Sequence, residues 1–107
     1  MKSSLAGILS LIMNKYELTL VLDGKGGVAK KKKYTEFVES LVKTFKGKVV
    51  TSKDWGVKDL AYKIKKSLTG LYLFFELELD PKSVKQINDK LRVDDDLLRY
   101  LLIRQEN

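Results

Sequence analysis

The chain has 107 residues and a formal net charge of +7, with 44% hydrophobic and 33% charged residues and no Cys or His. This length and composition suit one small domain with a single core. The lack of Cys and His excludes disulfide bonds and Ser–His or Cys–His nucleophiles, and it argues against zinc and haem sites. This composition therefore removes many classes of enzyme, and we expect no cofactor.

The positive charge is concentrated in the middle of the chain. Residues 25–66 contain 13 Lys against 4 acidic residues, a balance of +9, whereas residues 67–107 contain 6 basic against 8 acidic residues, a balance of −2. A basic segment of this kind is typical of proteins that bind a polyanion. A basic surface that serves only solubility is the simpler alternative.

The first twelve residues, MKSSLAGILSLI, differ from the rest of the chain. A Lys precedes an apolar run from Leu5 to Met13, which is shorter than the roughly 20 apolar residues that span a bilayer. The run also lacks the small-residue cleavage site of a signal peptide. We expect residues 1–12 to be an N-terminal extension without an assigned role, residues 13–107 to form one domain, and no membrane to be a partner.

The first predicted strand runs from Tyr16 to Asp23, where apolar and polar side chains alternate as in a half-buried strand. The segment Gly24–Gly27 interrupts it. From about Ala29 the apolar residues recur at helical spacing, and Gly47 supplies the helix stop. These apolar positions are Tyr34, Phe37, Val38, Leu41 and Phe45.

Two long extended segments follow the helix. The first, Lys48 to Lys65, is interrupted near Asp54 to Gly56, where the Gly indicates a bulge or a bend. A turn from Lys65 to Gly70 joins it to a strand from Leu71 to Leu79. The odd-numbered residues of that strand share one face, which is apolar, and the even-numbered residues share the other.

A second helix and a last strand complete the domain. Asp80 and Pro81 fit an N-cap and a first helical residue, and the final strand runs from Leu98 to Ile103. Between them, Asp94–Asp96 lacks the Gly and the distant Glu of a calcium loop and predicts a solvated loop. The order β-α-β-β-α-β predicts an α+β, ferredoxin-like split β-α-β fold, a four-stranded antiparallel sheet with two helices on one face.

The segment Gly24–Lys33, GKGGVAKKKK, lies between a strand and a helix, where a phosphate-binding loop would be found. It resembles the loop of ATPases that position the division machinery, but Ala29 replaces a required Gly and Lys31 a required Ser or Thr. The chain is also too short for the doubly wound sheet of such enzymes. We interpret the segment as a turn and a basic first helical turn, where an anionic group nearby would compensate the unfavourable Lys run.

One face of the predicted sheet carries an unusual set of outward side chains. Opposite the helices, these residues are Val21, Tyr72, Phe74, Arg99, Leu101 and Ile103. A contiguous apolar set on a surface indicates a binding site. We expect Tyr72, Phe74, Leu101 and Ile103 to contact a protein partner, because the Lys/Arg-Gly-aromatic consensus of an RNA-recognition motif is absent. A bulge that inverts the facing is the alternative.

Three segments carry a family resemblance. They are Lys15-Tyr16-Glu17 with the alternating strand that follows, Gly56 to Ile64 with its Leu-Ala-Tyr-x-Ile pattern before the Gly70–Leu79 strand, and Leu91-Arg92-Val93 leading into Leu98–Arg104. In this order and spacing they resemble the bacterial small-subunit ribosomal protein six family, from Met13 to about Gln105. None of the three is a catalytic signature.

The resemblance implies a structural protein of the cytoplasmic ribosome. It implies binding to the central domain of small-subunit rRNA, as a heterodimer with ribosomal protein eighteen. The family's RNA-contacting positions are matched here by Lys15 and Arg99, and its aromatic third strand by Tyr72 and Phe74.

The basic strand before the turn adds three expected RNA contacts, Lys58, Lys63 and Lys65. Two departures from the family occur there, since Asp59 interrupts a basic pair and Lys63 replaces a common Pro. A stand-alone RNA-binding or regulatory module of the same fold is the alternative function. A ferredoxin-like acyl phosphate hydrolase is disfavoured because the first loop has no Arg.

Overall fold

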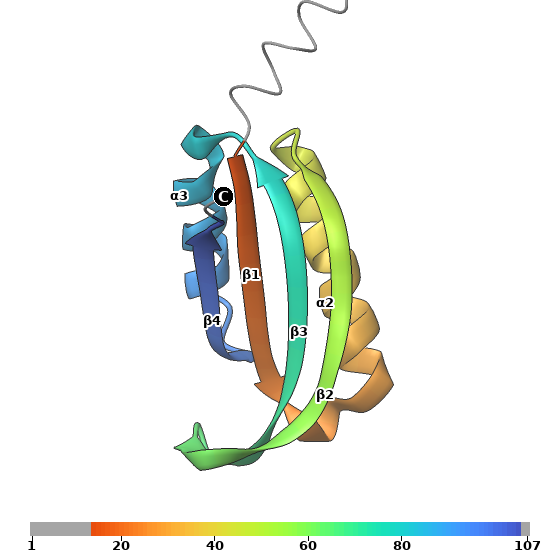
Figure 1. Ribbon diagram of the computed structural model, residues 1–107. Helices are drawn as coiled ribbons and strands as arrows, with labels where there is room; N and C mark the ends of the chain where they lie inside the picture. Colours follow the sequence, from red (N-terminus) through yellow and green to blue (C-terminus); the bar gives the residue numbers. More distant parts are fainter. Residues whose placement is uncertain (1–13, 106–107) are drawn as a thin grey trace, which may run out of the picture.

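The computed structural model describes residues 14–105, which form an antiparallel sheet with two helices behind it (Figure 1). The elements are β1 (Asn14–Asp23), the 3-10 turn η1 (Gly24–Gly26), α2 (Gly27–Thr44), β2 (Lys48–Ile64), β3 (Ser67–Leu79), α3 (Pro81–Arg92) and β4 (Leu97–Arg104). The strand order β2-β3-β1-β4 confirms the predicted ferredoxin-like fold. The predicted extension, residues 1–12, lies outside the described residues.

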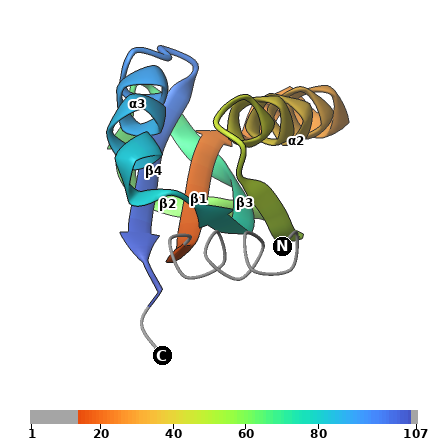
Figure 2. The same cartoon turned by 90° about the horizontal axis from the view of Figure 1, so that it is seen from above.

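The core lies between the sheet and the two helices, which cover the same face (Figure 2). Alternation along β1 and β3 places every second side chain there, and the apolar faces of α2 and α3 close it. Its fully buried large side chains are Leu18, Leu20, Leu22, Tyr34, Val38, Val42, Leu73, Phe75, Leu77, Leu79, Ile87 and Leu91. Among residues 14–105, no helix is long and apolar enough to cross a membrane.

The helix ends follow local chemistry that the sequence partly predicted. Asp80 is the N-cap of α3 and its carboxylate accepts from the Lys82 backbone N–H at 3.0 Å, as expected for an Asp-Pro start. Helix α2 begins two residues earlier than predicted, because the glycine segment winds into η1 and continues directly into the helix.

The end of α2 differs from the prediction in its cause. The residue with positive φ is Lys46 (φ 60), and Gly47 is not the left-handed residue. A side chain at Gly47 would instead lie within 2.6 Å of the Glu78 carbonyl oxygen. Gly47 therefore allows the chain to pass closely against the end of β3.

The turn between β2 and β3 is shorter than predicted. Ile64 pairs with Ser67, so only Lys65 and Lys66 form the turn, and both have positive φ (48 and 69). Such a turn matches the twist of a hairpin but is usually formed by Asn and Gly. Strand β3 therefore begins at Ser67 rather than Leu71.

The loop of three Asp residues is partly tied to the domain. The Tyr34 hydroxyl, on a side chain that is 1% exposed, donates to the Asp94 carboxylate, with both oxygens at 3.1 Å. Burial, followed by the hydrogen bond to Asp94, raises the pKa of Tyr34 above its ordinary value. Asp94 thus holds the start of β4 on α2, while Asp95 and Asp96 are exposed as expected.

Candidate nucleic-acid and partner interface

The sheet face away from the helices, called here the open face, is turned toward the viewer in Figure 1. Residues directly opposite each other on neighbouring strands share a face. Three such rows cross β3, β1 and β4: Tyr72–Val21–Arg99, Phe74–Thr19–Leu101 and Glu76–Glu17–Ile103. The predicted facing of Val21, Tyr72, Phe74, Arg99, Leu101 and Ile103 is therefore confirmed.

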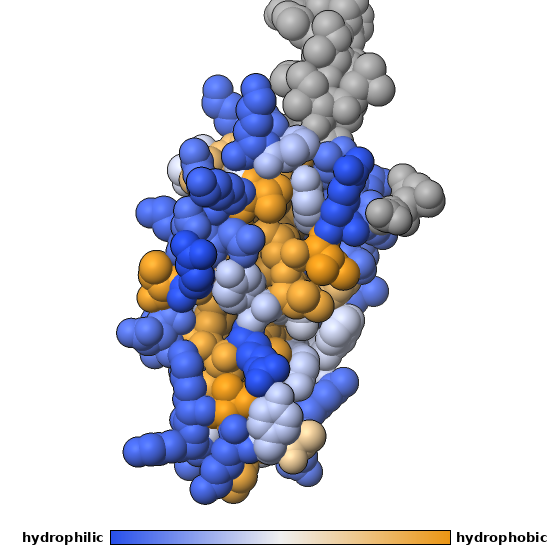
Figure 3. All heavy atoms as spheres, turned by 90° about the vertical axis from the view of Figure 1, so that its left-hand side faces the viewer, coloured by the Kyte–Doolittle hydropathy of each residue, from blue (hydrophilic) through white to orange (hydrophobic). Residues whose placement is uncertain are grey.

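Exposure on the open face is uneven. Leu101 and Ile103 on β4 are 56% and 44% exposed. Phe74, expected to be an exposed partner contact, is only 8% exposed because Trp55 stacks on it, with ring centroids 4.7 Å apart and planes 11° apart. The expectation of an exposed Phe74 was wrong. Seen from the β4 side, apolar side chains form a band between hydrophilic margins (Figure 3).

Trp55 is the residue of this face that the sequence analysis missed. It is the extra residue of a β-bulge in β2, since Asp54 pairs with Leu73 and Gly56 with Tyr72. Gly56 takes a φ of +82°, as the predicted bulge requires. A large aromatic residue beside a Gly at the interruption of a strand was the signal available in the sequence.

Asp54 holds this bulge from the other side of the sheet. One carboxylate oxygen accepts from the Gly56 backbone N–H at 2.8 Å, and the other lies 3.0 Å from the Lys31 ammonium on α2. The Lys31 hydrogen bond, followed by the Gly56 N–H, keeps the pKa of Asp54 below its ordinary value of 3.8. The bulge that carries Trp55 is therefore connected to the helix layer.

Lys30 and Lys33, also at the start of α2, lie near carboxylates as well. Lys33 lies 3.6 Å from Asp96. The pKa of Asp23 is lowered mainly because the Lys25 backbone N–H donates to it, and the charge of Lys30 adds to this effect. Three of the four lysines in the predicted basic helical turn are thus compensated by carboxylates within the domain.

Two of the predicted RNA contacts are held over aromatic rings. The Lys58 ammonium lies 5.9 Å from the ring centroid of Trp55 and 5.6 Å from that of Tyr72. Arg99 lies over Tyr62 at 5.4 Å, and its Nη2 donates to the Tyr62 hydroxyl at 2.8 Å. Both side chains thus lie at the surface in contact with aromatic rings.

The remaining predicted RNA contacts are distributed over the sheet. Lys63 is exposed on the turn end of β2. Lys15 stands opposite Glu78, six residues from Val21 along β1, which separates it from the Arg99 row by about 20 Å. The structure therefore does not bring Lys15 together with Lys58 and Arg99, and its RNA contact stays a prediction.

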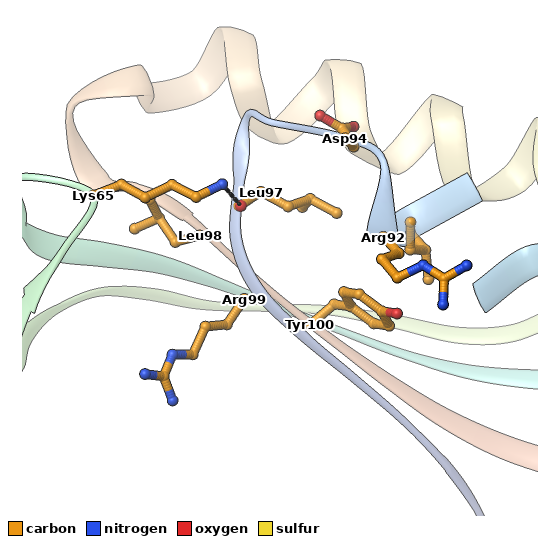
Figure 4. Close-up of a pocket in the computed structure, with 8 residues that line it drawn as sticks. Lys65, Arg92, Asp94, Leu97, Leu98, Arg99 and Tyr100 are labelled. Carbon is orange, nitrogen blue, oxygen red and sulfur yellow. Dashed lines mark hydrogen bonds between the residues drawn. The ribbon is translucent and has the colours of Figure 1, made fainter. Parts of the chain in front are cut away.

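Lys65 connects the turn end of the hairpin to the start of β4. Its ammonium donates to the carbonyl oxygens of Asp95 and Leu97, each at 3.1 Å. The hydrogen bond to Leu97 is drawn in Figure 4. In Figure 1 this end of β2 and β3 bends across the end of β1 toward β4. Lys65 thus has a structural contact, and its predicted RNA contact stays a prediction.

A hollow of about 320 Å³ lies beside this tether. Its lining includes Lys65, Arg92, Arg99 and Tyr100, but Figure 4 shows the two arginines pointing in different directions. The Arg92 guanidinium instead pairs with Asp89 at 2.8 Å on the same helix. The hollow therefore does not gather its cations around one ligand.

Acidification is expected to change the fluorescence of Trp55. The pKa of Asp54 in the folded chain is lower than its ordinary value of 3.8. The contacts of the Asp54 carboxylate are therefore complete above pH 3.8 and are lost as the pH falls through the pKa of the folded chain. The emission of Trp55, the only Trp of the chain, should change in that range. Asp54→Asn should remove the transition, whereas Asp89→Asn on α3 should preserve it. Far-UV circular dichroism separates this local change from unfolding, and an unaltered transition in Asp54→Asn would contradict the assignment.

Comparisons with known proteins agree with this arrangement. The family described as Ribosomal protein S6 matches residues 15–104. The small ribosomal subunit protein bS6 of Pelagibacter ubique is 34% identical over 92 residues, covering 86% of this chain and 76% of that protein. The protein of the same name from Geobacter sulfurreducens is 33% identical over 91 residues, covering 85% and 78%.

A solved structure supports the fold separately. The crystal structure of 30S ribosomal protein S6 from Thermotoga maritima superposes with a TM-score of 0.79, at 21% identity, and covers 87% of this chain and 88% of that chain. This similarity concerns the fold. With the family match over residues 15–104 and relatives above 30% identity, the chain belongs to the ribosomal protein S6 family, a family of structural, non-enzymatic ribosomal proteins.

Proposed function

We propose that the chain binds the central domain of small-subunit rRNA as a heterodimer with ribosomal protein eighteen on the cytoplasmic ribosome. The observation that carries the proposal is that the open face combines two features. Exposed apolar side chains lie on β4, and cations on β2 and β4 lie over aromatic rings on β3 and β2. The names of the relatives support a place in the small subunit.

Charge supports the RNA part of the proposal. The chain carries +7 overall, and +9 falls within residues 25–66, which include all of β2. Lys58 and Arg99 are exposed on the open face or its edge and supply donors for phosphate oxygens. The rRNA site would be recognised through its shape, with these contacts supplying affinity.

The β4 side of the open face supports a protein partner. Glu17 and Glu76 stand directly opposite each other beside the exposed Ile103. Like charges in such a pair repel each other, and no cation lies within salt-bridge distance of either among residues 14–105. A basic partner with an apolar contact surface would relieve the repulsion and cover Leu101 and Ile103.

Two variants separate the two parts of the proposal. Arg99→Ala should weaken binding to a central-domain rRNA fragment and leave the melting temperature unchanged. Leu101→Ala should weaken binding to purified ribosomal protein eighteen, and Val28→Ala, which trims an exposed apolar residue on α2, serves as its control. Titrations and co-sedimentation with small subunits measure both. Equal affinities for all three variants and the parent chain would refute the assigned surface.

A further inference from the structure

Trp55, Phe74, Tyr72 and Lys58 form a layered group on the open face, called here the Trp55 platform. The Trp55 ring lies nearly parallel on Phe74, and Phe74 is 8% exposed while Trp55 is 45% exposed. One ring is thus the buried support and the other is the upper layer that meets solvent. A flat aromatic surface of this kind accepts a further planar group by stacking.

The platform is fixed before any ligand binds. The bulge at Gly56 sets the backbone of Trp55, the Asp54 carboxylate holds the Gly56 N–H at 2.8 Å, and Lys31 holds Asp54 at 3.0 Å. A contact surface held in one geometry loses little conformational entropy on binding. The arrangement is therefore suited to binding and is more than a cover for Phe74.

Cations flank the exposed ring. Lys58 lies within 6 Å of both the Trp55 and Tyr72 ring centroids, and Lys53 stands opposite Phe74 on the neighbouring strand. Asp54, the nearest acidic residue along the strand, stands opposite Leu73 and so belongs to the helix-covered face. The surroundings of the ring on β2 are therefore cationic, in contrast to the acidic row near Ile103.

We propose that the Trp55 platform stacks one unpaired base of single-stranded RNA, while Lys53 and Lys58 bind the adjacent phosphates. The inference rests on the RNA binding proposed above and adds a base contact to it. Aromatic rings beside cations hold single strands in this way, because every base has a flat face and every linkage a phosphate. The platform lies on β2 and β3, and β1 separates it from Leu101 and Ile103 on β4, so one surface accommodates RNA and a protein partner together.

The only Trp of the chain reports the contact directly. Titration of the full chain with a mixed-sequence RNA single strand of about ten nucleotides should quench Trp55 fluorescence to saturation. The same strand annealed to its complement should quench little, because its bases are already paired and stacked. If the single strand binds the chain but neither the single strand nor the duplex quenches Trp55 fluorescence, the proposed base contact is overturned.

Variants separate stacking from charge and from folding. Trp55→Leu keeps an apolar cover on Phe74 but removes the ring, and it should bind the labelled strand at least about fivefold more weakly. Trp55→Phe should recover most of the affinity. Lys58→Met should weaken binding, whereas Lys85→Met, a matched loss of charge on α3, should have less effect. Thermal melts verify that each variant is folded.

Two further outcomes would overturn the inference in distinguishable ways. If Trp55→Leu binds both the single strand and the rRNA fragment as the parent chain does, the platform is not a base site while the proposed function stands. If ribosomal protein eighteen quenches Trp55 and RNA does not, the platform is a protein contact. If the parent chain binds neither the single strand nor the rRNA fragment, the proposed function itself is refuted.

Discussion

Phe75→Ala is expected to lower the free energy of unfolding by about 3–5 kcal/mol. Phe75 is fully buried between the sheet and the helices, so its truncation leaves a cavity that the surrounding leucines fill only in part. Urea denaturation measures this loss as a lower unfolding midpoint. The slope of the unfolding free energy against urea concentration should equal that of the parent chain. The substitution should leave the composition of the open face unchanged.

Phe74→Ala is the matched control, because the neighbouring residue points to the other face of β3. Phe74 is covered mainly by Trp55 at the edge of solvent, so its loss should cost less, about 1–2 kcal/mol. It should also alter Trp55 fluorescence, which Phe75→Ala should affect much less. If Phe74→Ala unfolds the domain and Phe75→Ala does not, the assignment of the two faces of β3 is wrong.

The alternation of β1 and β3 explains why the fold could be predicted from the sequence. In both strands one face is apolar at every second position, and a shift by one residue would expose the whole set. The same alternation predicts that Phe75 and Leu77 lie on the apolar face of β3, and both are 0% exposed. The Asp80-Pro81 start of α3 was predictable for a local reason, since its cap needs no distant contact.

The features that the sequence did not predict depend on pairing between distant segments. The two-residue turn at Lys65 and Lys66 lacks the Asn or Gly that normally indicates such a turn, and it is formed where β2 and β3 pair on both sides. The tether from Lys65 to the Leu97 carbonyl joins residues 32 positions apart. Neither the turn nor the tether leaves a local pattern in the sequence.

The candidate site shows the same division. Alternation along each strand correctly predicted that Tyr72, Arg99 and Leu101 share one face, as the observed strand pairing shows. Burial of Phe74 could not be predicted, because it depends on a bulge in β2 that turns Trp55 over it. Bulges break the alternation on which the sequence argument depends, and they occur often near binding sites.

Raising the salt concentration from about 50 to 200 mM should weaken the proposed RNA binding by about a hundredfold. The estimate assumes that about five Lys or Arg side chains neutralise phosphates of a single strand, with a logarithmic slope of about −0.7 for each. The basic balance of +9 in residues 25–66 motivates it. Anisotropy of a labelled rRNA fragment, measured across a salt series, gives the slope.

Single substitutions in the salt series identify the contacts that contribute to the slope. Lys58→Met and Arg99→Ala should each reduce its magnitude by about 0.7, because each removes one cation that would displace a counterion from the RNA. Lys85→Met removes the same charge from α3, behind the sheet, and should leave the slope unchanged. The contrast separates local phosphate contacts from the general attraction of a basic protein, which all three substitutions would reduce alike. An affinity that stays flat across the series, or a slope that falls equally in all three variants, would show that the open face is not where the phosphates bind.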